Sequence, residues 1–387
     1  MAKRWTRVLA VVLSIVALVL ALAGCQSAAP ASGPKPIVIG GALGTTGAAA
    51  MYAQAMQRGV DVAVNEINAA GGIDGRPVVF KQQDTASNKT QAVAVYQKQA
   101  ADPDVLVLIG ANASAEGLAV TAVANQVKLP FVSPGMTAVV SPNEDSKYSF
   151  RIAPTAPQAV QLATAALKQM GVKRVALIGA SDDDASIQPM NAFKAEAPKQ
   201  GIEIVKEVTY LRDAVDLSPQ LTEIKSVSGQ IDAIVAPVLA DALARMLKRG
   251  AELGIKTPWV SPVTQPIPSI WDASGGAALG MTSLMLLNPA STSKVVQGFV
   301  SDYKAKYGTT PGDIDGLGYD SALLVFDGIK RAGKEPTRDS IQKAMSTASI
   351  EGVTGSFSFK PGSGLAIRRS IGLGKVIAKG QFVAVSK

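Results

Sequence analysis

Two consecutive series of short apolar strands, separated by longer helical stretches, constrain the fold of this chain most strongly. The first series is expected at 37–40, 78–82, 105–109 and 131–132, and the second at 174–178, 203–209, 233–236 and 259–260. The string Pro130-Phe131-Val132-Ser133-Pro134 reappears in the second series as Pro258-Trp259-Val260-Ser261-Pro262. Any α/β protein alternates in this way, but the shared string favours a duplication. The pattern predicts the α/β class, with two doubly wound, Rossmann-like lobes in tandem.

The order of elements changes after Gly280, where helices come first and glycine-punctuated strands follow. Helices are expected at 50–69, 89–101, 117–127, 188–199, 217–228, 241–253, 294–307, 319–331 and 338–346, and the last strands at 355–359, 368–378 and 381–385. These final elements are too few for a third domain, so we expect them to complete the two lobes. Lobe 1 is then expected at 36–152 and 287–354, and lobe 2 at 153–286 and 355–387, with a three-segment hinge crossing near 151–155, 284–289 and 353–360.

The N-terminal 24 residues have the layout of a secretory signal peptide, with three basic residues followed by an apolar run from Val8 to Gly24. The string Leu22-Ala23-Gly24-Cys25 resembles the bacterial lipobox, in which the cysteine is lipidated after cleavage. Cys25 is the only cysteine of the chain. We therefore expect a signal peptide over 1–24, and a lipidated tether over 25–35 that is rich in Ala, Ser, Gly and Pro. An ordinary signal with an accidental cysteine is the alternative.

Composition removes several classes of function. The chain has no histidine, which excludes Ser-His-Asp and Cys-His catalysis and histidine-ligated zinc. It has no P-loop, dinucleotide fingerprint or Gly-x-Ser-x-Gly elbow, and Asp182-Asp183-Asp184 lacks the alternating oxygen ligands of a calcium loop. Basic residues are scattered among acidic ones, which argues against nucleic-acid binding. We predict a protein that is not an enzyme and that needs no cofactor and no metal.

Small and hydroxyl-bearing residues follow the expected strands of the first lobe. Ser114 comes after the strand at 105–109, in a loop with Asn112, and Thr137 comes after the strand at 131–132, close to Gly135. Ligands of open α/β sheets bind beyond the carboxyl ends of the strands. Two hydroxyl groups and free amides at a helix N-terminus make an anion site there. The alternative is that Ser114 and Thr137 only cap helices.

Several short motifs follow one another in a particular order along the chain. The most specific motif is Gly59-x6-Glu66-Ile67-Asn68-x2-Gly71-Gly72-Ile73. It is followed by Asp84-Thr85, by Pro130 to Pro134 and by Gly318-Tyr319-Asp320-Ser321-Ala322. These motifs and their order resemble those of the branched-chain amino-acid (leucine/isoleucine/valine-binding) group of ABC-importer substrate-binding proteins, which have the type I periplasmic-binding fold. The resemblance covers nearly all of 36–387 and implies two lobes that close on a ligand.

The resemblance assigns roles to particular positions of this chain. The ligand carboxylate is expected at Ser114 and Thr137, helped by the backbone of Gly135, and Tyr52 is expected to line the cleft. Lobe 2 departs from the family pattern, because its ammonium-binding glutamate falls at Val263, beside Thr264, and its first tyrosine falls at Asp184. The ligand is therefore either an amino acid held differently, with Asp184 as acceptor, or a small aliphatic or aromatic acid without an amine.

We therefore expect an extracytoplasmic, lipid-anchored protein that captures a small carboxylate-bearing solute and delivers it to the transmembrane subunits of an ABC permease. One alternative is a ligand-sensing protein of the same fold without a transporter. The other is an extracytoplasmic enzyme, against which the missing histidine, nucleophile elbow and metal cluster argue.

Overall fold

The computed structural model describes residues 34–140, 145–360, 362–368 and 372–385. The chain divides into two units, residues 1–35 and 36–387, and the fold described below is that of the second unit. The expected signal peptide and Cys25 lie outside the described residues.

The first sheet is built from five parallel strands in the order β2-β1-β3-β4-β5. Their bounds are β1 Ile37–Leu43, β2 Val78–Asp84, β3 Val105–Gly110, β4 Phe131–Ser133 and β5 Ser149–Arg151. β1 and β3 are apolar runs that are almost wholly buried, as expected for central strands covered on both faces. The first four strands were predicted. The three-residue β5, which contains a serine and an arginine, was not.

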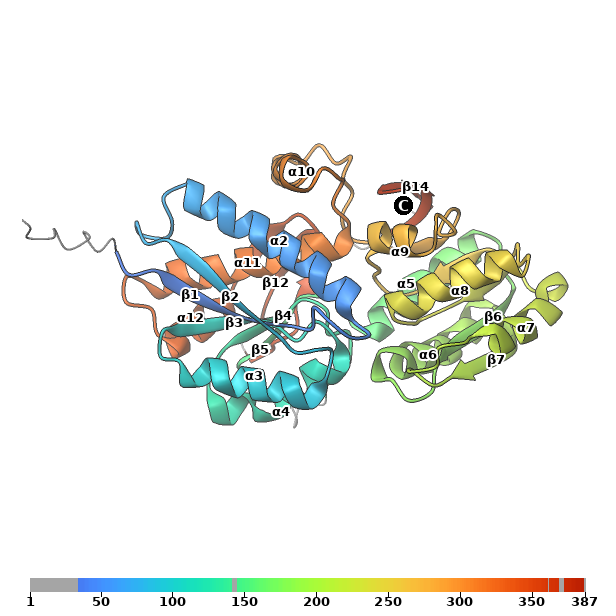
Figure 1. Ribbon diagram of the computed structural model, residues 1–387, viewed down its shortest axis with the longest axis horizontal. Coiled ribbons are helices and arrows are strands. Elements are labelled where there is room, and N and C mark those ends of the chain that lie inside the picture. Colours follow the sequence, from blue (N-terminus) through green and yellow to red (C-terminus); the bar gives the residue numbers. More distant parts are fainter. Residues whose placement is uncertain (1–33, 141–144, 361, 369–371, 386–387) are drawn as a thin grey trace, which may run out of the picture. The chain divides into compact units, whose positions relative to one another are not determined.

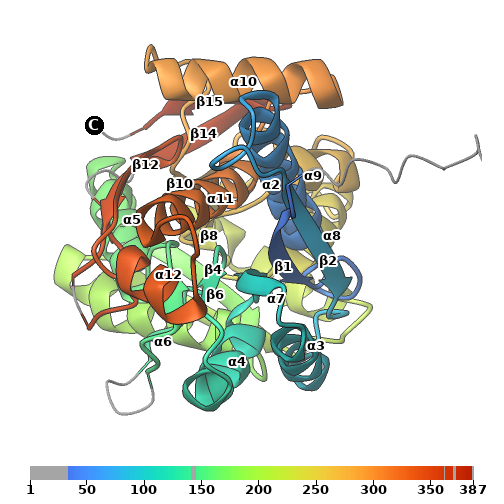
Figure 2. The same cartoon turned by 90° about the vertical axis from the view of Figure 1, so that its left-hand side faces the viewer.

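Helices cover both faces of this sheet, with α2 and α11 on one face and α3 and α4 on the other (Figure 1). Their bounds are α2 Ala50–Ala69, α3 Lys89–Ala101, α4 Ser114–Val127 and α11 Asp313–Ala332. α10 (Lys294–Tyr307) packs on α2, and α12 (Arg338–Met345) packs on α11 (Figure 2). Asn88 begins α3 by accepting hydrogen bonds from the amides of Thr90 and Gln91, a capping geometry that its sequence position favours.

The second sheet has seven strands in the order β15-β14-β10-β9-β8-β6-β7. Their bounds are β6 Arg174–Ala180, β7 Glu203–Tyr210, β8 Ala233–Val235, β9 Trp259–Ser261, β10 Thr282–Met285, β14 Gly372–Ala378 and β15 Gln381–Ala384. β14 pairs antiparallel with both of its neighbours, β10 and β15, and the remaining pairs are parallel. The α/β class predicted from the strand–helix alternation is therefore confirmed.

The helices of the second half pack around this sheet. α5 packs against α6, and α7 packs against α8, which in turn contacts α9. Their bounds are α5 Ala156–Gln169, α6 Asp184–Glu196, α7 Ser218–Ser226, α8 Ala240–Glu252 and α9 Ile267–Ala273. α5, α9 and β10 were not predicted. α6 begins four residues earlier than expected, because Asp183 caps it by accepting from the amide of Ala185.

A small third sheet pairs β11 (Ser349–Gly352), β12 (Gly355–Ser358) and β13 (Ile367–Arg368) in antiparallel fashion. The third expected crossing, at 353–360, therefore lies within this sheet, and the chain joins the seven-stranded sheet at β14. The first expected crossing lies between β5 of the first sheet and α5. The second begins at the end of β10 and leads toward α10.

Two buried aspartates and a part-buried arginine hold together the segments near these crossings. Asp313 accepts from the amides of Leu286 and Leu287 at 3.0 and 2.7 Å. Seven residues later on α11, Asp320 accepts from the amides of Val353 and Thr354. The guanidinium of Arg368 donates to the carbonyls of Ile152 and Thr354. One helix and one arginine therefore contact all three segments that the sequence marked as crossings.

Asp313 gives the fold a testable pH dependence. Burial raises the pKa of its carboxyl from 3.8 to about 7, against the opposing effects of two backbone hydrogen bonds and Arg368, while Asp315 adds to the rise. The folded protein thus binds this proton more tightly than the unfolded chain, and stability from this group falls as pH rises from about 4 to about 7. Asparagine keeps an acceptor for both amides but cannot ionise.

We therefore expect Asp313→Asn to flatten the pH dependence of the free energy of unfolding in that window, by up to about 1.4 kcal/mol per pH unit. Urea unfolding of both proteins across the window measures this. Parallel pH profiles for the two proteins would show that the Asp313 carboxyl does not titrate in the folded state.

Candidate functional site

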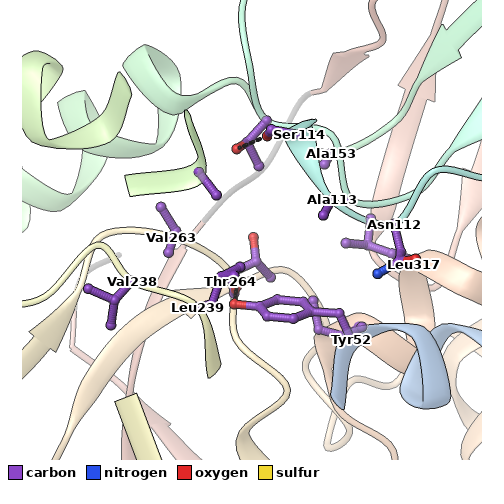
Figure 3. Close-up of a pocket in the computed structure, with 14 residues that line it drawn as sticks. Tyr52, Asn112, Ala113, Ser114, Ala153, Val238, Leu239, Val263, Thr264 and Leu317 are labelled. Atoms are coloured by element: carbon purple, nitrogen blue, oxygen red, sulfur yellow. Dashed lines mark hydrogen bonds between the residues drawn. The ribbon is translucent and has the colours of Figure 1, made fainter. Parts of the chain in front are cut away.

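A pocket lies where the carboxyl ends of the first-sheet strands face loops of the second sheet (Figure 3). Its empty volume, which includes space open to solvent, is about 500 Å³. The pocket brings together residues from both halves: Tyr52, Asn112, Ala113, Ser114, Gly135, Thr137, Ala153, Ala185, Val238, Leu239, Val263, Thr264, Ile314 and Leu317.

Ser114 and Thr137 meet on the first-sheet side of the pocket. Their hydroxyl oxygens lie 3.4 Å apart. The N-cap of α4 is Ala113, with no side-chain capping bond, and the next helix after Thr137 begins at Ala156. Neither hydroxyl therefore holds a helix-capping position. The first hydrogen bond of α4 runs from the Gly117 amide to the Ala113 carbonyl, so the amides before Gly117 precede the helical ladder and add donors to this end.

Gly135 and Asn112 bring the loops after β3 and β4 into contact. A Cβ on Gly135 would lie 2.2 Å from the carbonyl oxygen of Asn112, so only glycine allows this approach. The Asn112 side chain accepts from the Gly44 amide at 2.7 Å and donates to the Ala49 carbonyl at 3.4 Å. Both ends of that amide are engaged with the loop after β1, so we interpret Asn112 as a residue that positions the site.

Tyr52 reaches the pocket from the first turn of α2. Its hydroxyl donates to Gln265 Oε1 at 2.6 Å, and the residue is 9% exposed. Burial raises the pKa of this hydroxyl well above 10, so it stays a donor at neutral pH. Sequence reasoning placed Tyr52 in the cleft, but it did not assign a role to Gln265.

The second-sheet side of the pocket is mostly apolar. Ala185, Val238, Leu239 and Val263 line it, and Thr264 adds a hydroxyl. Among the described residues that line the pocket, none carries a charge. These lining residues therefore offer no carboxylate that could pair with the ammonium group of a ligand.

Asp184, the acceptor suggested for an amino-acid ligand, does not line this pocket. It lies in the first turn of α6, is exposed, and borders a separate hollow together with Asp182, Asp183 and Arg212. Ala185 lines the pocket instead, because α6 begins at Asp184 and leaves the Asp184 side chain exposed to solvent.

Three residues that line the pocket could not be predicted from the sequence. Ile314 and Leu317 belong to α11, 200 residues or more after Ser114, and Ala153 lies between β5 and α5. All three are small or apolar and carry no motif. Only the packing of α11 against α2 brings the first two to the pocket.

The comparisons with known proteins agree with this architecture. The sequence model of the periplasmic binding protein family matches residues 36–381, and the chain belongs to this family. It comprises solute-binding proteins, which are not enzymes. The predicted resemblance and the type I periplasmic-binding fold are thereby confirmed.

Individual relatives are similar over most of their length. The Leu/Ile/Val-binding protein homolog 8 of Brucella abortus is 25% identical over 79% of this chain and 78% of its own. The leucine-binding protein LivK of Thermotoga maritima is 26% identical, with a TM-score of 0.78 over 90% of this chain and 97% of its own. A solute-binding protein of R. palustris in complex with benzoate has a TM-score of 0.79 at 21% identity, over 90% and 95% of the two chains, and shows the fold alone.

Two further features concern only the part of the chain that the structure describes. Within it, no helix is long and apolar enough to cross a membrane. In the same residues, no group of three or more His, Cys, Asp or Glu side chains could hold a metal ion.

Proposed function

We propose that this chain is a lipid-anchored extracytoplasmic solute-binding protein that captures a small carboxylic acid without an ammonium group and delivers it to an ABC permease. The two lobes, assigned as 36–152 with 287–354 and 153–286 with 355–387, close around the ligand. The observation that carries the proposal is the asymmetry of the pocket, with paired hydroxyls on one side and an uncharged, mostly apolar wall on the other.

Each side of this pocket suits one end of such a ligand. Ser114, Thr137 and the free amides of α4 donate hydrogen bonds to a carboxylate, and bonds to a charged group contribute about 1.5–3 kcal/mol each. Val238, Leu239 and Val263 give apolar contact to an aliphatic or aromatic body. A ligand ammonium would lose its hydration without a carboxylate partner, which is costly.

A thermal-shift screen against amino acids, aliphatic acids and aromatic acids tests the proposed ligand class. A ligand that binds the folded state raises the melting temperature by mass action. We expect shifts with 4-methylpentanoate or benzoate, and smaller or no shifts with leucine and isoleucine. A larger shift with any amino acid than with its amine-free analogue would overturn the proposed class.

Replacing Val263 by glutamate adds a carboxylate to the uncharged, mostly apolar wall of the pocket. Val263 is 7% exposed, so a carboxylate there is buried without a cation, and we expect at least about a tenfold loss of affinity for amine-free acids. Leucine binding should improve relative to 4-methylpentanoate, because the new carboxylate offers the missing partner. Val263→Gln matches the size without the charge. Equal effects of both variants in calorimetry would show that bulk, not charge, governs this position.

The anchor is tested at Cys25. Its place after Leu22-Ala23-Gly24 and its uniqueness in the chain motivate the assignment. Stable anchoring takes more than one acyl chain, which a diacylglycerol supplies. We expect Cys25→Ser to move the protein from the membrane fraction to the soluble fraction, with loss of the acyl mass on residue 25. Ser27→Cys as a second substitution should not restore anchoring, because the thiol no longer follows the cleavage motif. Unchanged detergent partitioning of Cys25→Ser would contradict lipidation.

A further inference from the structure

Gln265 lies at the centre of a hydrogen-bond group that spans both halves of the molecule. It follows β9 and is fully buried. Its Oε1 accepts from the Tyr52 hydroxyl at 2.6 Å, and its Nε2 donates to the Val238 carbonyl and to Ser261 Oγ, both at 2.9 Å. A carbonyl can only accept, so the bond to Val238 fixes which end of the amide faces Tyr52.

These bonds connect three separate parts of the fold. Val238 follows β8 and Ser261 ends β9 in the seven-stranded sheet, whereas Tyr52 belongs to α2, which packs on the five-stranded sheet. The bond between Tyr52 and Gln265 therefore joins the two lobes directly, through protein atoms alone. Its acceptor is rigidly held, because the same amide is fixed at two other points within lobe 2.

We propose that Tyr52 and Gln265 form an interlobe latch, a ligand-independent hydrogen bond that favours the closed arrangement of the lobes. The bond exists only while α2 touches the loop after β9. A contact present in one of two states shifts the population toward that state, and the apparent affinity of every ligand that requires it rises by the same factor. The inference rests on the proposed closure of two lobes, but not on the proposed ligand class.

The test compares Tyr52→Phe, Gln265→Leu and the double variant in the full-length chain. Each protein also carries Cys25→Ser, which removes the native thiol. Two further substitutions at exposed positions, Lys98→Cys on α3 and Lys248→Cys on α8, each provide a site for one fluorophore. Energy transfer then reports the interlobe distance without added ligand, and calorimetry gives the Kd for benzoate and for 4-methylpentanoate. Tyr96→Phe is the matched control, because it removes a buried hydroxyl that bonds to Leu129 within one lobe.

We expect each single variant to lengthen the mean interlobe distance and to weaken both ligands by the same factor, about threefold to tenfold. The double variant should be no worse than either single one, since the same bond is lost in each. Tyr96→Phe should leave the distance unchanged. Unchanged distances in both single variants, or additive losses of affinity, would overturn the latch.

A ligand contact would give a different result. If the Tyr52 hydroxyl acted on the ligand directly, Tyr52→Phe would affect the two acids unequally and Gln265→Leu would not reproduce it, which would also overturn the proposal. If Gln265→Leu fails to fold, Tyr52→Phe still decides, because it removes one oxygen and keeps the ring. The distance measurement needs no ligand, so it remains decisive even if neither acid binds and the proposed ligand class fails.

Discussion

Replacing Ser114 or Thr137 by alanine is expected to weaken binding of 4-methylpentanoate by about tenfold to a hundredfold each. The two hydroxyls lie 3.4 Å apart at the ends of neighbouring strands, so one carboxylate can accept from both. A hydrogen bond to a charged group contributes about 1.5–3 kcal/mol, which corresponds to that range of Kd. Calorimetric Kd measured beside the melting temperature separates binding from stability.

Thr337→Ala provides the matched control for this experiment. Thr337 caps α12 by accepting from the Ser340 amide at 3.1 Å, and it is not among the residues that line the pocket. Its loss should cost about 1 kcal/mol of stability and leave the Kd unaltered. If Ser114→Ala and Thr137→Ala behave in the same way, with lower melting temperatures and unchanged Kd, the two hydroxyls are structural.

The contact between α2 and α11 should be highly sensitive to the addition of a single methyl group. A Cβ on Gly318 would lie 2.0 Å from the Met56 carbonyl oxygen, and this atom belongs to the backbone of α2 and cannot rotate away. We therefore expect Gly318→Ala to lower the free energy of unfolding by about 3 kcal/mol or more, since overpacking forces the helices apart. Chemical denaturation measures the loss.

Gly298→Ala is the control for helix propensity. Gly298 lies on the exposed face of α10, where an added Cβ would meet no atom within 4 Å, so alanine there should stabilise by up to about 1 kcal/mol. The same substitution is thus expected to have opposite signs in two helices. A small or stabilising effect at Gly318 would mean that the two helices are not in close contact in solution.

The first-sheet half of the site could be predicted because its residues directly follow strands that are recognisable in the sequence. Strand ends of a parallel sheet converge on one edge, so Ser114 and Thr137 could be placed together from the positions of β3 and β4 alone. Ile314 and Leu317 could not be found in this way, because they reach the pocket through helix packing between distant parts of the chain. β5 and β10 were missed because they are short and not uniformly apolar.

The residues that identified the family mainly maintain the fold. Asn68 bonds to both backbone groups of Val78, which fixes the turn between α2 and β2. The hydroxyl of Tyr319 donates to Glu66 at 2.5 Å and joins α11 to α2. Asp320 holds the segment at Val353. A motif of this kind therefore predicts the architecture and says little about the ligand, which depends on positions such as Val263.

Calorimetry of the full-length chain with leucine and 4-methylpentanoate tests the proposed ligand class most directly, because the two compounds share a carbon skeleton and differ by one ammonium group. Because no charged residue lines the pocket in the described part of the chain, we predict a Kd for 4-methylpentanoate at least about tenfold lower than for leucine. The Ser114→Ala and Thr137→Ala double variant should lose the 4-methylpentanoate signal. A leucine Kd equal to or lower than that of 4-methylpentanoate would contradict the proposed ligand class.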